Sequence, residues 1–146
     1  MEWLKKLEGS IVGLDTAPLI YFIEEHPKYL TVLDAFFLAV KEGKTSVVTS
    51  SLTLTEVLVH PLRKENWGLV SEYKSILLSA NGLETIPINN EIAELAAGLR
   101  AKYQLLTPDA LQIATAVYSG AKHFLTNDLK LKNVHAIKVL CLDDLC

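Results

Sequence analysis

Short apolar runs alternate with longer stretches of helical period along this chain. The runs fit strands that are buried on both faces of a parallel sheet. They occupy residues 11–14, 46–49, 84–88, 123–126 and 138–141. Proline cannot donate to a sheet ladder, so Pro87 predicts that the third strand lies at an edge of the sheet.

Helices are expected between these strands. Apolar residues recur at helical spacing, and the expected helices cover residues 30–40, 51–60, 67–80, 92–103 and 107–119. Gly43 and Gly120 end two of them, Pro61 limits the second, and Thr107 caps the last, with Pro108 at its first position. The alternation predicts a single α/β domain, with a five-stranded parallel sheet and helices on both faces.

Length and composition agree with one globular domain. The chain has 146 residues, half of them hydrophobic, which excludes intrinsic disorder. It has no apolar run near the roughly 20 residues of a transmembrane helix, and its charged first residues lack the apolar core of a signal peptide. We therefore expect a cytoplasmic protein without a membrane contact. Cys141 and Cys146 are expected to be reduced thiols.

The net charge of −3 argues against a protein that binds nucleic acid through a broad basic surface. Only Arg63 and Arg100 are arginines. The charge leaves open an enzyme that meets nucleic acid through bound cations.

Four acids fall at the carboxyl edge of the predicted sheet, where open α/β sheets form their sites. Asp15 follows the first strand, Asp128 follows the fourth, and Glu56 lies in the helix that leaves the second. Asp109 begins a helix that a short turn joins to the fourth strand, so this helix start returns to the same edge. Alternation alone does not fix the path of the helix at residues 92–103.

Each acid also has a structural explanation. Asp15 could cap the next helix, Asp109 could complement a helix dipole, Asp128 could shape a turn, and Glu56 could pair with a structural partner. These explanations serve one acid at a time, whereas packed carboxylates repel unless a cation or proton joins them. Mg²⁺ and Mn²⁺ prefer oxygen ligands, and a pair of such ions can promote phosphodiester hydrolysis.

The acids also stand in family motifs, which are Leu14-Asp15-Thr16, Thr55-Glu56-Val57, Pro108-Asp109-Ala110 and Thr126-Asn127-Asp128. In this order and spacing the chain resembles a PIN domain, and in size it resembles the VapC-type ribonuclease toxins of toxin–antitoxin systems. The resemblance runs from about residue 11 to 142, within one domain of residues 1–146 that carries an N-terminal extension at 1–10. It implies a Mg²⁺- or Mn²⁺-dependent endoribonuclease, often a homodimer.

The resemblance assigns metal binding and catalysis to the four acids, with support from three neighbours, Thr16, Thr126 and Asn127. It also implies an RNA substrate and a possible cognate antitoxin. Apolar positions in the helices around 30–40 and 67–80 would suit a homodimer contact. The extension and the low arginine count leave an alternative, a diverged or catalytically weak PIN-domain protein that acts as a protein-binding scaffold.

Other α/β classes fit less well. A phosphoacceptor receiver domain needs an aspartate at the end of its third strand, where this chain has Pro87, Ile88 and Asn89. No P-loop motif for nucleotide binding occurs. Neither cysteine has an identifiable activating partner, which argues against a thiol enzyme.

Overall fold

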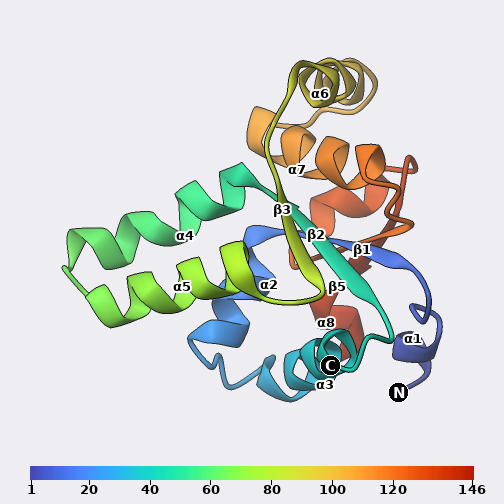
Figure 1. Cartoon of the computed structure of the whole chain (residues 1–146). Helices are drawn as coiled ribbons and strands as arrows, with labels where there is room; N and C mark the ends of the chain where they lie inside the picture. The colour runs from blue at the N-terminus through green and yellow to red at the C-terminus, as the bar shows by residue number, and fades with distance from the viewer.

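The chain folds around one five-stranded parallel sheet (Figure 1). A computed structural model describes all 146 residues. The strand order is β3-β2-β1-β4-β5, and every neighbouring pair is parallel. The strands are β1 (Ile11–Leu14), β2 (Ser46–Ser50), β3 (Leu83–Ile86), β4 (His123–Thr126) and β5 (Lys138–Cys141). The predicted α/β class, parallel sheet and edge position of the third strand are confirmed.

Eight α-helices and one 3₁₀-helix connect and flank the strands. They are α1 (Glu2–Lys5), α2 (Thr16–Ile23), α3 (Leu30–Lys41), α4 (Ser51–Arg63), α5 (Trp67–Ser79), α6 (Asn90–Lys102), α7 (Thr107–Tyr118), η1 (Leu129–Asn133) and α8 (Leu142–Leu145). The short elements α1, η1 and α8 were not expected from the sequence, and α2 was anticipated only as the helix that Asp15 could cap. None of the helices is long and apolar enough to cross a membrane.

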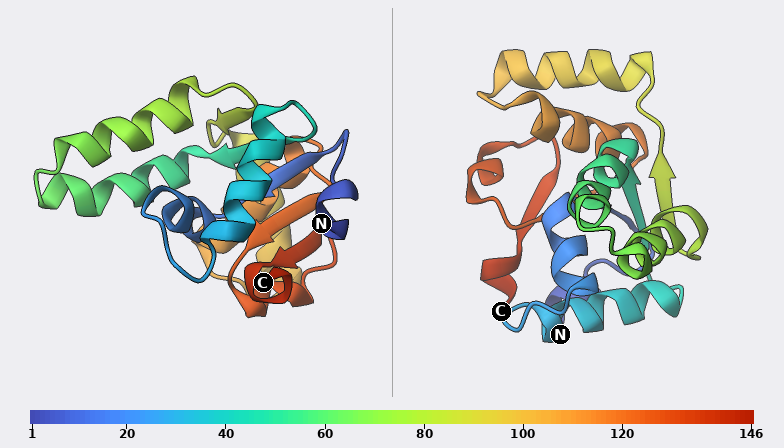
Figure 2. Two further views of the ribbon diagram at one scale, coloured as in Figure 1. Left: turned by 90° about the horizontal axis from the view of Figure 1, so that it is seen from below. Right: turned by 90° about the vertical axis from the view of Figure 1, so that its left-hand side faces the viewer.

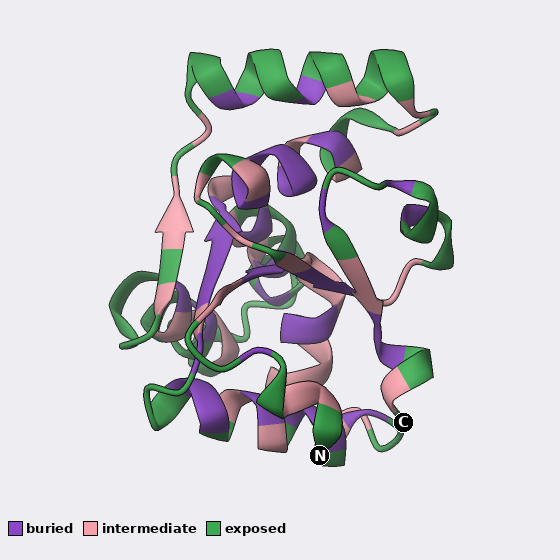
Figure 3. Cartoon of the chain, turned by 90° about the vertical axis from the view of Figure 1, so that its right-hand side faces the viewer, coloured by how far each residue is buried: buried purple, intermediate pink, exposed green.

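Helices cover both faces of the sheet, as predicted, but in unequal layers. The largest core cluster packs α2, α3, α4 and α5 onto one face. On the other face α7 lies against the strands, and α6 lies outside α7 (Figure 2). Most of α6 is therefore exposed, and it buries only Ile92 and Ala96, against Ala110 and Ala114 of α7 (Figure 3). The sequence pattern left the path of the helix at residues 92–103 open. In the structure this helix, α6, lies outside α7 and does not separate α7 from the sheet.

The contact between α7 and β1 depends on a residue without a side chain. A Cβ atom at Gly13 would lie 2.4 Å from the Cβ of Ala116 and 2.9 Å from a ring carbon of Phe124. Only glycine lets the helix approach the central strand this closely. This packing sets the position of α7, and with it the position of Asp109 in its first turn.

Two helix ends differ from the prediction. Helix α4 runs through Pro61 and ends at Arg63. Pro61 lies in the last turn, where it costs one backbone hydrogen bond and gains a buried ring. Thr107 is the first residue of α7 rather than its N-cap, a position that Leu106 holds. The Thr107 hydroxyl instead accepts a hydrogen bond from Arg100 at 2.8 Å.

Residues 1–10 pack onto the domain. Leu7 is 1% exposed within the main core, the Trp3 ring stacks on Phe36, and the Gly9 amide donates to the Lys44 carbonyl. Helices α4 and α5 form an antiparallel hairpin that projects from the body of the domain (Figures 1 and 2). Both cysteines are free thiols, as expected.

Candidate functional site

Asp15 lies where the central strand β1 meets helix α2. It is the N-cap of α2, and its Oδ1 accepts a hydrogen bond from the Thr16 amide at 2.8 Å. Its Oδ2 accepts a second bond from the Thr126 hydroxyl at 2.7 Å, across the β1–β4 pair. The capping role that the sequence allowed is therefore real. It does not exclude another role, because a carboxylate oxygen has a second lone pair.

The Thr126 hydroxyl connects Asp15 to Asp128. It donates to Asp15 and accepts a bond from the Asp128 amide at 3.0 Å. Asp128 in turn caps η1, since its Oδ1 accepts from the Lys130 amide at 3.0 Å. Thr126 is fully buried, so this connection is shielded from water.

Glu56 reaches the same edge from the second turn of α4. Its side chain is exposed, but the Thr16 hydroxyl donates to its Oε1 at 2.6 Å. Thr16 therefore contacts two of the acids, Asp15 through its amide and Glu56 through its hydroxyl.

Asp109 completes the set from the first turn of α7. Burial raises its pKa first, and the charges of Asp15, Asp128 and Glu56 raise it further, while Lys130 opposes them. The pKa of Asp15 is also raised, chiefly by burial. Hydrogen bonds from Thr126 and the Thr16 amide act against that rise, and the charges of Glu56 and Asp128 add to it. Glu56 and Asp128 thus lie close enough to both Asp15 and Asp109 for their charges to raise the pKa values of those two acids.

This donor set fits a hard divalent cation by its chemistry. The edge gathers four carboxylates, and the pKa values of Asp15 and Asp109 are raised first by burial and then by the charges of the other acids. A divalent cation held by these acids would relieve the repulsion between them. As the side chains stand, no three His, Cys, Asp or Glu residues are grouped so that they could hold a metal ion.

Asn127 differs from the other predicted residues. Its amide donates to the Tyr29 hydroxyl at 3.1 Å, and its Oδ1 faces the Cys141 thiol at 3.8 Å. Tyr29 then donates to Asp143 of α8 at 2.6 Å. The Asn127 side chain therefore ties β4 to α3 and the C-terminus, and the structure does not bring it together with the four acids.

Three residues beneath the acids were missed by the sequence reasoning, namely Ser50, Thr53 and Gln112. All three are buried and form hydrogen bonds to one another or to Thr16. One signal was available, since Gln112 is three residues after Asp109 on a helix whose other buried residues are apolar apart from Thr115. Nothing in the spacing shows that Gln112 meets Thr16, which is 96 residues away in sequence.

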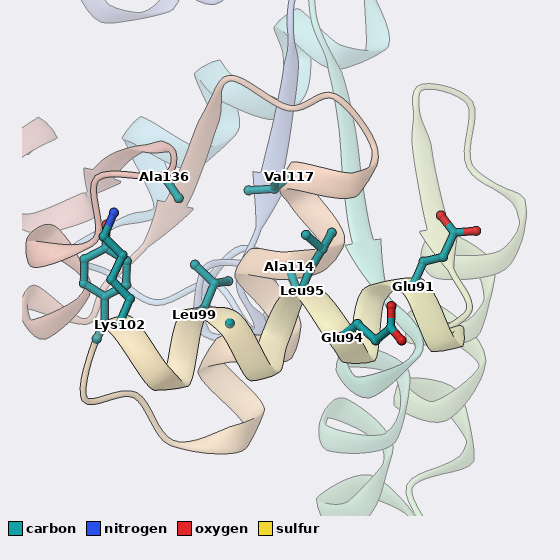
Figure 4. A pocket seen from close by; sticks show the side chains of 10 residues that line it. Glu91, Glu94, Leu95, Leu99, Lys102, Ala114, Val117 and Ala136 are labelled. Carbon is teal, nitrogen blue, oxygen red and sulfur yellow. The ribbon is translucent and has the colours of Figure 1, made fainter.

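A groove of about 590 Å³ lies elsewhere on the surface. It runs between α6 and the later turns of α7, and Leu95, Leu99, Ala114, Val117 and Ala136 are among its lining residues (Figure 4). None of the four acids lines it.

The fold is shared with solved structures of toxin–antitoxin proteins. VapBC2 from Rickettsia felis, bound to a DNA fragment from its promoter, matches with a TM-score of 0.69 and 20% identity, over 90% of this chain and 98% of that one. A toxin–antitoxin complex from Klebsiella pneumoniae matches with a TM-score of 0.68 and 23% identity, over 91% and 98%. VapC20 from Mycobacterium tuberculosis, a Sarcin-Ricin loop cleaving toxin, gives 0.65 and 16%, over 88% and 99%.

The sequence comparison gives the family. No curated protein matches the sequence. The model of the PIN domain family matches residues 12–137, which include nearly all of β1, the whole of β2, β3 and β4, and all four acids, and which end just before β5. The chain therefore belongs to the PIN domain family.

Proposed function

We propose that this protein is a Mg²⁺- or Mn²⁺-dependent endoribonuclease that hydrolyses phosphodiester bonds in RNA. The observation that carries the proposal is the meeting of Asp15, Glu56, Asp109 and Asp128 at one sheet edge, where burial and, after it, the charges of the other acids raise the pKa of Asp15 and of Asp109. Membership of the PIN domain family supports the same conclusion. A net charge of −3 also suits an enzyme that meets a polyanion through cations.

In this proposal the four acids hold the metal. A bound divalent cation supplies an activated water and stabilises the charge of the leaving oxygen. The protein's own groups then have orienting roles. The Thr126 hydroxyl fixes one oxygen of Asp15, the Thr16 hydroxyl fixes one oxygen of Glu56, and the Lys130 charge acts on Asp109.

We also propose that the protein is the toxin of a toxin–antitoxin pair. Two of the structural neighbours are toxin–antitoxin complexes, and this chain covers 98% of each matched chain, so it has the size of a stand-alone toxin. An acidic edge attracts cationic groups, and an arginine of a small partner could form charge-assisted hydrogen bonds to Asp15 or Asp109. Such a partner would cover the site and stop cleavage.

The nuclease activity is tested with purified protein and single-stranded RNA. Mn²⁺ should support cleavage, and EDTA should stop it. Asp128→Asn should reduce the rate by roughly tenfold or more, since electrostatic groups of an active site typically contribute at least this much. The matched control is Asp34→Asn, which neutralises an exposed acid on α3 and should cleave like the wild type. Equal rates for Asp128→Asn and the wild type would remove Asp128 from the site.

The toxin role needs a separate test in cells. Expression of the chain alone should arrest growth, and either Asp15→Asn or co-expression of a small protein encoded beside it should relieve the arrest. An active nuclease that is harmless in cells and co-purifies with no small protein would contradict the toxin role. A folded protein with no metal effect and no cleavage would instead support the scaffold alternative.

A further inference from the structure

A buried chain of hydrogen bonds runs beneath the acidic edge and ends on Glu56. It includes Ser50 at the end of β2, Thr53 in the first turn of α4, and Gln112 in α7, which are 0%, 0% and 3% exposed. Gln112 lies at its centre. The Gln112 amide nitrogen donates to the Thr53 hydroxyl at 2.7 Å and to the Thr16 hydroxyl at 3.2 Å.

The direction of each hydrogen bond in this buried series follows from one backbone carbonyl. The Leu14 carbonyl can only accept, so the Thr49 hydroxyl, 2.9 Å away, must donate to it. The Thr53 hydroxyl lies 2.7 Å from Thr49, whose proton is already committed, so Thr53 donates to Thr49. Thr53 can then only accept from the atom of Gln112 that faces it, and that atom must be the amide nitrogen.

Ser50 fixes the other end of the Gln112 side chain. Its hydroxyl donates to Gln112 Oε1 at 2.7 Å and accepts from the Leu52 amide at 3.1 Å as the N-cap of α4. Both ends of the Gln112 amide are thus satisfied in one orientation. In that orientation the amide presents its second hydrogen to the Thr16 hydroxyl.

The consequence reaches the edge of the site. Because Thr16 accepts from Gln112, its own proton is free for Glu56, 2.6 Å away, rather than for Thr53, whose oxygen is 3.4 Å away. Glu56 is exposed, and an unrestrained glutamate side chain loses rotamer entropy when it is fixed. The bond from Thr16 orders this carboxylate before any ligand arrives.

We propose that Gln112 is a positioning residue, which aims the Thr16 hydroxyl at Glu56 and so holds that carboxylate at the acidic edge. This proposal rests on the proposed metal-dependent nuclease. Gln112 itself touches neither metal nor RNA. A purely structural role, as a polar link between β2 and α7, would lower stability without changing the site.

The test uses Gln112→Met, which keeps the shape and removes the hydrogen bonds, alone and combined with Thr16→Val. Thr115→Val is the matched control, because Thr115 is a buried residue of the same helix whose hydroxyl bonds only to the Leu111 carbonyl, at 2.8 Å. Urea unfolding without metal measures stability for all variants. Calorimetric titration with Mn²⁺ measures the dissociation constant for the folded proteins.

Gln112→Met should weaken Mn²⁺ binding about tenfold, the lower limit for residues that orient metal ligands. In the Thr16→Val background the same change should add little, because its effect passes through Thr16. Thr115→Val should bind Mn²⁺ like the wild type even where it lowers stability, and Thr16→Ser should bind nearly as well, since it keeps the hydroxyl.

Four results would overturn the proposal or the metal site on which it rests, and each can be told from the others. Wild-type affinity in Gln112→Met would show that the link is only structural. An equal loss in both backgrounds would show that Gln112 does not act through Thr16. Additive effects of the two substitutions on metal-free unfolding would show that the hydrogen bond between them is absent. A wild-type protein that binds no Mn²⁺, with Gln112 and Thr16 still coupled in unfolding, would refute the metal site and leave the hydrogen-bond chain intact.

Discussion

A Cβ atom at Gly13 would lie only 2.4 Å from the Cβ of Ala116. The backbone of the central strand β1 therefore packs directly against a side chain of helix α7. Asp15 and Asp109 are the nearest acids along the two elements. The separation of these two carboxylates therefore depends on a contact that no larger residue permits.

Gly13→Ala should for this reason be destabilising, by about 1–3 kcal/mol, the typical cost of an overpacked core. Gly98→Ala is the control, because its Cβ would meet nothing within 4 Å on an exposed turn of α6. That change should stabilise by about 0.5–1 kcal/mol through helix propensity. Urea unfolding checks both, and a Gly13→Ala protein as stable as the wild type would contradict the close packing.

The raised pKa of Asp109 predicts a pH-dependent effect of Asp109→Asn on metal-free protein. Since the folded-state pKa lies above the ordinary 3.8, the folded state binds more protons than the unfolded state, and wild-type stability falls as pH rises through that window. Well below pH 3.8 the carboxyl is neutral in both states. Asp109→Asn carries no such charge, so its stability relative to the wild type should increase with pH and then level off.

Unfolding curves in EDTA over a pH series measure this difference. The comparison is sensitive because no hydrogen bond to the Asp109 carboxylate is lost in the variant. A variant less stable than the wild type at neutral pH would show that the favourable helix dipole outweighs burial and repulsion.

Divalent metal should make the wild type more stable than the variants that lack one of the four acids. Mn²⁺ at a hundred times its dissociation constant stabilises a single-site protein by about 2.7 kcal/mol, which for this size means a rise of several degrees in Tm. Asp15→Asn should keep the fold, because asparagine caps a helix as well as aspartate, and it should lose most of the rise. Thermal unfolding with and without Mn²⁺ checks this, and an undiminished rise in Asp15→Asn would place the metal elsewhere.

We further expect a homodimer that uses α3 and α5. These helices leave Leu38, Trp67 and Leu78 exposed by 54%, 61% and 56%, and exposed apolar surface of this kind is typical of a two-fold interface. Light scattering at tens of micromolar should give twice the 16.2 kDa chain mass. Leu78→Glu should shift the protein towards the monomer. A wild-type mass of 16.2 kDa at that concentration would refute the dimer.

The sequence predicted the elements of this site better than its contacts. Asp15 and Asp128 follow strands directly, so the carboxyl-edge rule places them from the strand pattern alone. Asp109 needed an assumption about the return of a helix, which the outer position of α6 makes correct. The side chain of Asn127 could not be placed, because neighbouring residues after a strand point to opposite sides and its partner, Tyr29, is 98 residues away.

The hydrogen-bond chain was beyond prediction for a related reason. Ser50 stands in a run of polar residues, and Gln112 is a polar residue between apolar neighbours, but neither pattern identifies a hydrogen-bond partner. Their bond spans 62 residues and joins β2 to α7. The N-cap of α7 was mispredicted for the same reason. Thr107 is a residue type that often caps helices, but its hydroxyl bonds to Arg100 of the preceding helix.

The pairing of β1 with β4 also determines at what stage of synthesis the acidic edge can form. Thr126 lies 111 residues after Asp15, and β1 has only β2 as a partner until β4 has been synthesised. Contacts between such distant segments form slowly during folding. A nascent chain on the ribosome therefore carries Asp15 and Glu56 long before it can bring Asp109 and Asp128 to them. A fragment that ends before β4 would be inert, however well its first half folds, and the activity would belong only to the finished chain.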